Sequence, residues 1–274
     1  IKRHHLNIHM QLLSIFSEYG VITIVTLFVF SFVAGFIDAI AGGGGLIQLP
    51  VMLIAFPKIP MPTIFGTNKI ASFAGTGISA YQYARRVKFN YTLLSLIVIA
   101  AGIASFSGAR LVTYLDVNKL KPLVLIVLVI IAAYTFLKKD IGAIQTKQLS
   151  IERQYLYGAI MGMVIGFYDG FFGPGTGSFF MLGFVVVLGF EFVQASAYAK
   201  LINCFTNLSA LFVFIRHGHY ILELAIPLAV CNITGNWIGS RMAIQKGNRF
   251  IRSIFLLIVT LLILRYGYDV FVRQ

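Results

Sequence analysis

Long apolar stretches separated by short polar segments dominate this chain. Five of them run for about 18 residues or more with almost no charged side chain, at 21–40, 92–115, 120–137, 194–215 and 221–244. At about 1.5 Å per helical residue, such a stretch crosses roughly 30 Å of hydrocarbon. The pattern predicts membrane-spanning helices. The first stretch is interpreted as a span and not as a cleavable signal, because its polar flank is long and no small-residue cleavage site follows it.

Glycine clusters interrupt the apolar pattern at two places. Gly42, Gly43, Gly44 and Gly45 follow the stretch 21–40, and the segment 173–177 follows the stretch 155–172. A short apolar run comes after each cluster, at 46–56 and 178–189. Lipid cannot satisfy the backbone at such breaks, so protein must enclose them or they must face a water-filled cavity. A short helix starting there would direct free N–H groups and a positive dipole end into that cavity, which favours an anion. The alternative is that the glycines only permit close helix packing.

Charged residues recur at one fixed interval of 131 positions. The pairs are Asp38 and Asp169, Lys69 and Lys200, Arg85 and Arg216, Arg110 and Arg241. Only seven charged side chains stand between residues 32 and 112, so four coincidences at a single offset indicate an ungapped duplication. Each half contains five apolar segments, an odd number, which predicts that the second half is inserted upside down relative to the first.

The expected fold is all-α: a polytopic transmembrane helical bundle built from two inverted five-segment repeats with glycine-broken half-helices. We predict an interfacial N-terminal segment, a first repeat, a linker and a second repeat at 1–20, 21–138, 139–153 and 154–272. The short runs after the glycines could cross the membrane or turn back. Basic segments at 85–88, 138–147 and 246–252 then all lie in the cytoplasm, whereas Lys2 and Arg3 disagree with this topology.

Composition supports a membrane protein. The chain of 274 residues is 58% hydrophobic and 11% charged, with a mean hydropathy of +0.87, more apolar surface than a soluble fold could bury. Its net charge of +13 sits mainly at span ends, where it fits orientation in the membrane and contact with anionic lipid, not nucleic-acid binding. Cys204 and Cys231 fall inside apolar spans as small hydrophobes. We expect no disulfide framework, metal site or cofactor.

Two lysines are the leading candidates for anion contact. A helical projection places Lys200, Asn203 and Asn207 on one face, and the first half has Lys69, Ser72 and Thr76 as their counterparts. A lysine near a helix end can also snorkel to the interface, which is the ordinary alternative. We expect these six residues to form the substrate path together with the glycine breaks and nearby hydroxyls: Gly42, Gly43, Gly44, Gly45, Gly173, Gly175, Thr176, Gly177 and Ser178.

Asp38 and Asp169 are the carboxylates well inside apolar spans. Each could bind a coupling proton, or could neutralise a lysine or arginine as a structural partner. Arg110 and Arg241 are expected to serve in coupling or charge balance, with a role as boundary anchors as the alternative. Arg85 and Arg216 end their spans and are expected to be anchors.

The glycine segments resemble a known family. Residues 35–45 (GFIDAIAGGGG) and 166–175 (GFYDGFFGPG) resemble the paired signature of the TauE/SafE family of sulfite and organosulfonate exporters, and 67–69, 197–203 and 239–241 match as well. The likeness runs from about residue 21 to 272. It implies a multi-pass carrier of the bacterial inner membrane for small anions such as sulfite, thiosulfate and organosulfonates, with its site at the glycine segments and lysines.

The leading hypothesis is therefore a secondary anion transporter, a probable exporter, working by alternating access around a central site. The alternative is an anion channel that uses the same glycine-lined path. An enzyme is disfavoured because the sequence has no HExxH, no P-loop and no nucleophile and base within one motif. The anion transported, the direction of transport, a coupling proton or cation and the oligomeric state are left open.

Overall fold

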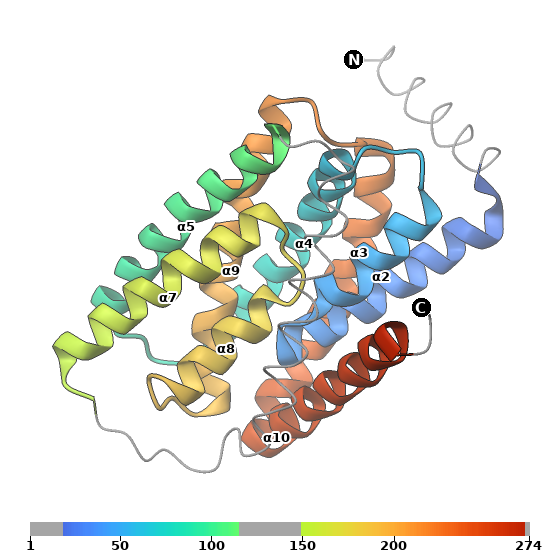
Figure 1. The fold of residues 1–274 in the computed structure, drawn as a ribbon. Coiled ribbons are helices and arrows are strands. Elements are labelled where there is room, and N and C mark those ends of the chain that lie inside the picture. The colour runs from blue at the N-terminus through green and yellow to red at the C-terminus, as the bar shows by residue number, and fades with distance from the viewer. Residues whose placement is uncertain (1–18, 115–148, 272–274) are drawn as a thin grey trace.

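The computed structural model describes residues 19–114 and 149–271, and its regular elements there are all α-helices (Figure 1). This confirms the predicted all-α class. The helices are α2 (Val21–Ala41), α3 (Gly44–Ala55), α4 (Met61–Ala84), α5 (Tyr91–Tyr114), α7 (Ile151–Phe171), α8 (Thr176–Val186), α9 (Phe192–Arg216) and α10 (Leu222–Phe271).

The predicted spans reappear as helices. Three of them, α2, α5 and α9, are long and apolar enough to cross a membrane by length and composition. The stretch 221–244 forms the first part of α10. The predicted span 120–137 lies outside the described residues, as do most of the interfacial segment 1–20 and of the linker 139–153. Helix α7 begins at Ile151, inside the end of that linker.

The duplication is visible in the helix bounds. Shifting α2, α3 and α4 by 131 positions places them within one residue of α7, α8 and α9 at each end. Shifting the start of α5 gives the start of α10. The fourth and fifth segments of the second half are joined in α10, which is interrupted at Gly247 by a positive φ of 69°.

Helix packing repeats between the halves. Helix α5 packs along α7 as α10 packs along α2, and α4 and α9 pack on each other in the middle of the bundle. Glycines mark each contact: Gly166 faces the backbone of Ala101, and its counterpart Gly35 faces that of Asn232. A Cβ at either glycine would overlap these backbones, so both helix pairs depend on close backbone approach.

The bundle has two ends, which we name the Arg85 end and the Arg216 end. At the Arg85 end, α4 finishes, α5 and α9 begin, and the Asn90 amide donates to the Tyr198 hydroxyl at 2.7 Å. At the Arg216 end, α9 finishes, α10 begins, and the Ile221 amide donates to Thr67 Oγ1 at 3.0 Å. The basic stretches 85–88 and 246–252, expected to share one face of the membrane, lie at the same end of the fold.

The short helices α3 and α8 turn back instead of continuing across the bundle. The Tyr19 ring at the start of α2 meets the Phe56 ring at the end of α3, with centroids 4.7 Å apart. The start of α2 and the end of α3 therefore lie together, so α2 and α3 form a helical hairpin. Helix α2 runs parallel to α10, so the α2–α3 hairpin enters from the Arg216 end; α7 runs parallel to α5, so the α7–α8 hairpin enters from the Arg85 end.

Candidate functional site

The bends of the two hairpins touch each other in the interior. A Cβ at Gly42 would overlap the backbone of Gly177 and Ser178, and Gly42 has a positive φ of 79°. The Ser178 amide donates to Gly42 O at 3.1 Å, and Ser178 Oγ donates to Ala41 O at 2.6 Å. Only glycine combines this conformation with this contact. The glycine breaks predicted from the sequence thus meet at one point.

Both short helices begin at this junction. Their N-cap residues, Gly43 and Gly175, provide no side-chain cap. The amides of Gly44, Gly45 and Gly177 find no acceptor among the described residues. Unsatisfied N–H groups and the positive ends of two helix dipoles therefore converge on the same region, which favours negative charge there.

Two ion pairs cross between the halves beside the bends. Lys69 Nζ lies 2.8 Å from Asp169 Oδ2, and Lys200 Nζ lies 2.8 Å from Asp38 Oδ2. Each lysine thus pairs with the aspartate of the other half, and the duplication relates one pair to the other. All four residues are at most 8% exposed. Ion pairing with a lysine is the geometry that the structural role of the aspartates requires.

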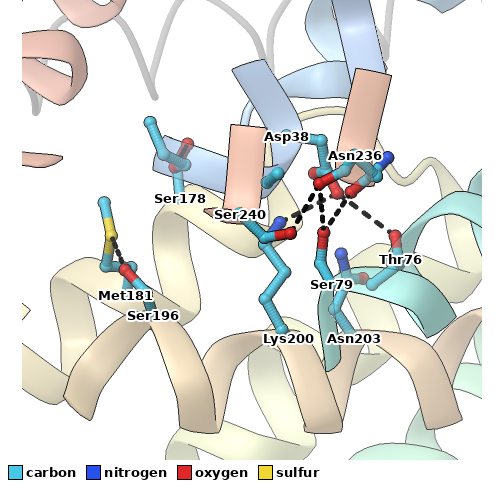
Figure 2. A network of polar contacts seen from close by, with 12 residues as sticks. Asp38, Thr76, Ser79, Ser178, Met181, Ser196, Lys200, Asn203, Asn236 and Ser240 are labelled. Atoms are coloured by element: carbon cyan, nitrogen blue, oxygen red, sulfur yellow. Dashed lines mark hydrogen bonds and ion pairs between the residues drawn. The ribbon is translucent and has the colours of Figure 1, made fainter. Parts of the chain in front are cut away.

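One member of each pair has a further hydrogen bond, whereas Asp169 Oδ2 and Lys200 Nζ have none beyond the ion pair among the described residues. Lys69 Nζ donates to Asn207 Oδ1 at 2.8 Å, and Thr76 Oγ1 donates to Asp38 Oδ2 at 3.1 Å. Figure 2 shows Lys200 extending from α9 toward Asp38, with Thr76 approaching the same carboxylate from α4. Because the two pairs balance their own charge, the positive character of the site comes from the helix N-termini.

A small cavity of about 30 Å³ lies among these groups. At about 10–15 Å³ for each water, it has room for roughly two water molecules. Predicted site residues lining it are Gly42, Gly44, Gly45, Lys69, Ser72, Thr76, Gly173, Gly175, Thr176, Gly177, Asn203 and Asn207. Residues Asp38, Asn68, Asp169 and Asn232 also line it.

Three predicted substrate residues do not line the cavity. Gly43 is the N-cap of α3, Lys200 lies against Asp38, and the Ser178 hydroxyl is held by Ala41 O. Ser178 therefore ties the two hairpins together instead of offering its hydroxyl to an anion. A serine at the start of a helix can bind an anion or can bond to a neighbouring backbone carbonyl, and the sequence did not distinguish these two roles for Ser178.

The two arginines expected in coupling or charge balance are exposed and do not line the cavity. Arg110 is on the outer side of α5, and the Arg241 guanidinium lies over the Trp237 ring, 5.5 Å from its centroid. The lysines take the place beside the aspartates that the arginines could have filled. The physical reason for Arg241 is its position along α10, nine residues beyond Asn232, which lines the cavity, so that it lies at the Arg85 end of the bundle.

The sequence interpretation predicted two of the asparagines that line the site, Asn203 and Asn207, but missed Asn68 and Asn232. Asn232 Nδ2 donates to Gln48 Oε1 at 3.0 Å, which joins α10 to α3 beside the cavity. Asn68 precedes Lys69, and its Oδ1 has no partner among the described residues. The signal for Asn232 was available: Asn232 and Asn236 stand four positions apart on one face of an apolar span.

The two histidines in the described part of the chain lie away from this site. His217 and His219 are at the Arg216 end, with ring centroids 6.3 Å apart. Partial burial, with a smaller contribution from His217, lowers the pKa of His219 below its usual value. Within the described residues, no group of three or more histidines, cysteines, aspartates and glutamates could hold a metal ion.

The fold and the site define an integral membrane protein with a buried polar cavity between two related helical halves. The chain belongs to the sulfite exporter TauE/SafE family, whose model matches residues 27–266. This confirms the resemblance found in the glycine segments.

Relatives cover nearly the whole chain. It is 38% identical over 239 residues to "Probable membrane transporter protein ORF9" of Sinorhizobium sp., an alignment that covers 87% of this chain and 90% of the relative. It is 33% identical over 245 residues to the probable membrane transporter protein YfcA of Escherichia coli K12, covering 89% of each chain. A probable membrane transporter protein of Haemophilus influenzae is 32% identical, covering 92% of this chain and 97% of the relative. No solved structure matches the chain.

Proposed function

We propose that this protein is a secondary transporter, in the export direction, of small inorganic or organic sulfur oxyanions such as sulfite, thiosulfate and organosulfonates. The observation that carries the proposal is the junction of the two bends. Unpartnered amides of Gly44, Gly45 and Gly177 meet there in a buried cavity, next to lysines that are already paired. The relatives' names as probable membrane transporters, and the sulfite exporters that give the family its name, agree with it.

Anion recognition in this proposal uses neutral donors first. Backbone amides at the two helix starts and the hydroxyls of Ser72 and Thr76 can donate to oxyanion oxygens, as can the Asn203 amide group. Lys69 can also contribute positive charge to anion binding. In the empty site Asp169 balances that charge, so the lysine is not an unpaired cation. An empty site that is neutral overall avoids the cost of a buried unpaired cation between transport events.

Cavity size bears on the cargo. A volume of about 30 Å³ suits a compact inorganic oxyanion better than an organosulfonate with a carbon chain, unless the two halves move apart. We therefore place sulfite first among the candidate anions. Such a small cavity also favours a carrier, whose site opens in turn to each side, over a permanently open channel.

The mechanism proposed is alternating access between two inverted repeats. Two features support it: hairpins that enter from opposite ends, and packing of α5 on α7 that is repeated by α10 on α2. The ion pairs Lys69–Asp169 and Lys200–Asp38 join the halves at the centre, so rocking of one half on the other acts directly on the site. In this proposal the Arg85 end faces the cytoplasm, and the clustering of Arg85, Arg86 and Lys246 near that end supports this orientation in an inner membrane.

Counterflow in proteoliposomes tests the proposal. Vesicles containing the purified protein and unlabelled sulfite should accumulate external labelled sulfite transiently, because a carrier exchanges its cargo. A channel would equilibrate the label without this overshoot. Vesicles without protein, and vesicles with the Gly42→Leu variant, serve as controls. Absence of counterflow with sulfite, thiosulfate and a panel of organosulfonates would refute the proposed function.

A further inference from the structure

A second pocket opens at the Arg85 end of the bundle, between α4 and α10. Its volume is about 800 Å³, far larger than the central cavity. Arg85, Arg86 and Arg241 line it, and its described lining includes no carboxylate. Aromatic rings position two of these side chains: the Arg85 guanidinium lies 5.6 Å from the Tyr81 centroid, and that of Arg241 lies 5.5 Å from the Trp237 centroid. The pocket is thus positively charged and partly preorganised.

A polar stripe on α4 leads from the central cavity to this pocket. Ser72 and Thr76 line the cavity, Ser79 follows one turn later, and Gln82 lines the pocket after one more turn. Spacings of three and four residues put these side chains on one helix face. Polar residues on a buried helix face are costly unless they are hydrogen-bonded, so a continuous row of them requires an explanation.

The facing stripe is on α10. Asn232 lines the cavity, Asn236 and Ser240 follow at intervals of four, and Arg241 lines the pocket. The stripes meet between the two spaces, where Ser79 Oγ donates to Asn236 Oδ1 at 2.6 Å (Figure 2). Asn236 Nδ2 in turn donates to Asn232 Oδ1 at 2.8 Å. Ser79 and Asn236 are fully buried, so their contact closes the way from pocket to cavity.

The duplication supplies an internal comparison. The positions related to Ser79 and Gln82 in the second half are Ala210 and Val213, both buried. Those related to Asn232 and Ser240 are Ala101 and Ala109, whereas Asn236 and Arg241 keep polar counterparts, Ser105 and Arg110. Aromatic and arginine positions of the pocket are shared by both halves: Tyr81 and Trp237 correspond to Phe212 and Phe106, whose ring centroids are 6.5 Å apart, and Arg85 and Arg241 correspond to Arg216 and Arg110. The difference between the halves lies in Ser79, Gln82, Asn232 and Ser240. Helix packing shared by both halves therefore does not account for the polar stripes.

We propose that the arginine pocket is a second anion-binding site, an antechamber that gathers small oxyanions at the Arg85 end, and that the Ser79–Asn236 contact closes the passage to the central cavity. The inference rests on the proposed anion transport and adds a route and a gate to it. The arginines attract anions to the pocket and so raise the local anion concentration outside the closed contact. The anions stay solvated there, in contrast to an anion in the buried central cavity.

Charge selectivity of thiol labelling tests the antechamber. Gln82→Cys, in protein carrying Cys204→Ser and Cys231→Ser, is reacted with an anionic and a cationic methanethiosulfonate reagent of similar size. We expect the ratio of the anionic to the cationic reaction rate to be higher at Gln82→Cys than for a free thiol in solution. In water, one positive charge at a separation of about 8 Å changes each rate about 2.4-fold in opposite directions, so Arg241→Gln should lower the ratio about sixfold. Arg110→Gln, the matched change in the other half, should leave it unaltered. Equal ratios in all three proteins would overturn the proposal.

Lipid headgroups share this oxyanion chemistry, and nanodisc composition separates the two sources. The Gln82→Cys ratio is measured in phosphatidylcholine discs and in discs containing phosphatidylglycerol. A pocket that serves free anions keeps its preference in both. A preference that vanishes only with phosphatidylglycerol would assign the pocket to a lipid phosphate and contradict the antechamber.

Labelling inside the passage tests the gate. Ser79→Cys should react with the anionic reagent applied from the Arg85 end, and the modification should block sulfite counterflow. Ala210→Cys, the matched position, should react at least tenfold more slowly from the Arg216 end. An unreactive Ser79→Cys in a variant that still transports would place the route elsewhere. The labelling ratio at Gln82→Cys is measured without any transported anion. A protein that does not transport sulfite can therefore still show the anion preference of the pocket, so the two proposals fail independently.

Discussion

Breaking one cross-half ion pair should destabilise the protein strongly, whereas removing the same pair as a unit should not. Lys200 Nζ lies 2.8 Å from Asp38 Oδ2, and the two side chains are 1% and 11% exposed. Lys200→Met leaves Asp38 as an uncompensated buried charge, a change that typically costs about 3–5 kcal/mol. At about 2–4 °C for each kcal/mol in a chain of this size, the melting temperature should fall by roughly 10 °C.

The double variant Lys200→Met with Asp38→Leu replaces both charges by apolar groups. It should melt within roughly 3 °C of the unmodified protein, because a buried pair often contributes little relative to hydrophobic replacements. The matched control is Lys200→Met with Asp169→Leu, which removes one member of each pair and leaves Lys69 and Asp38 unpaired. Because the two unpaired groups, Lys69 and Asp38, line the same cavity, its two losses should add incompletely, to a fall of roughly 10–20 °C.

The assay is thermal unfolding of purified protein in detergent, followed by intrinsic fluorescence, for the four members of each double-mutant cycle. Cycles for the true pair and for the mismatched pair carry the same kinds of side-chain change. Similar non-additivity in both cycles, or additivity in the true pair, would refute the pairing of lysines with the aspartates of the opposite half.

Three further predictions concern the bend, the carboxylates and the histidines. Gly42→Ala should lower the melting temperature by roughly 5 °C or more, since its Cβ would overlap the Gly177 backbone at a positive φ; Gly102→Ala, with open space at its Cβ, should not lower it. Asp169→Asn should reduce sulfite uptake by the same factor at every pH, because the carboxylate holds Lys69; a shifted pH profile would instead assign it the coupling proton. The lowered pKa of His219 means that the unfolded chain binds its proton more readily, so stability should fall slightly as the pH drops below about 6.5, and His219→Gln should remove that component of the melting curve.

Much of the helix layout could be predicted from local pattern. The lengths of the apolar stretches predicted the membrane spans, and the glycine clusters predicted where α2 and α7 end. The 131-residue offset fixed which elements correspond, so the bounds of α2, α3 and α4 predict those of α7, α8 and α9 to within one residue. These features depend on residues close together in the chain or on a repeat, and both are visible without the fold.

Long-range pairing could not be predicted in the same way. Lys69 had two aspartates and Asp38 several basic residues as candidate partners, and the choice depends on how α4 and α9 cross. Whether α3 crosses or turns back depends on the contact between Gly42 and Gly177, more than 130 residues apart. Asn232 reaches the cavity only because α10 packs along α2.

Anomalous X-ray diffraction from crystals soaked in selenite, a heavier analogue of sulfite, tests the central claim most directly. The account predicts a selenium peak at the junction of the bends, with oxygens within hydrogen-bonding distance of the Gly44, Gly45 and Gly177 amides, at about 2.7–3.2 Å. A peak confined to the arginine pocket, or an empty junction at a selenite concentration that saturates binding in solution, would contradict it.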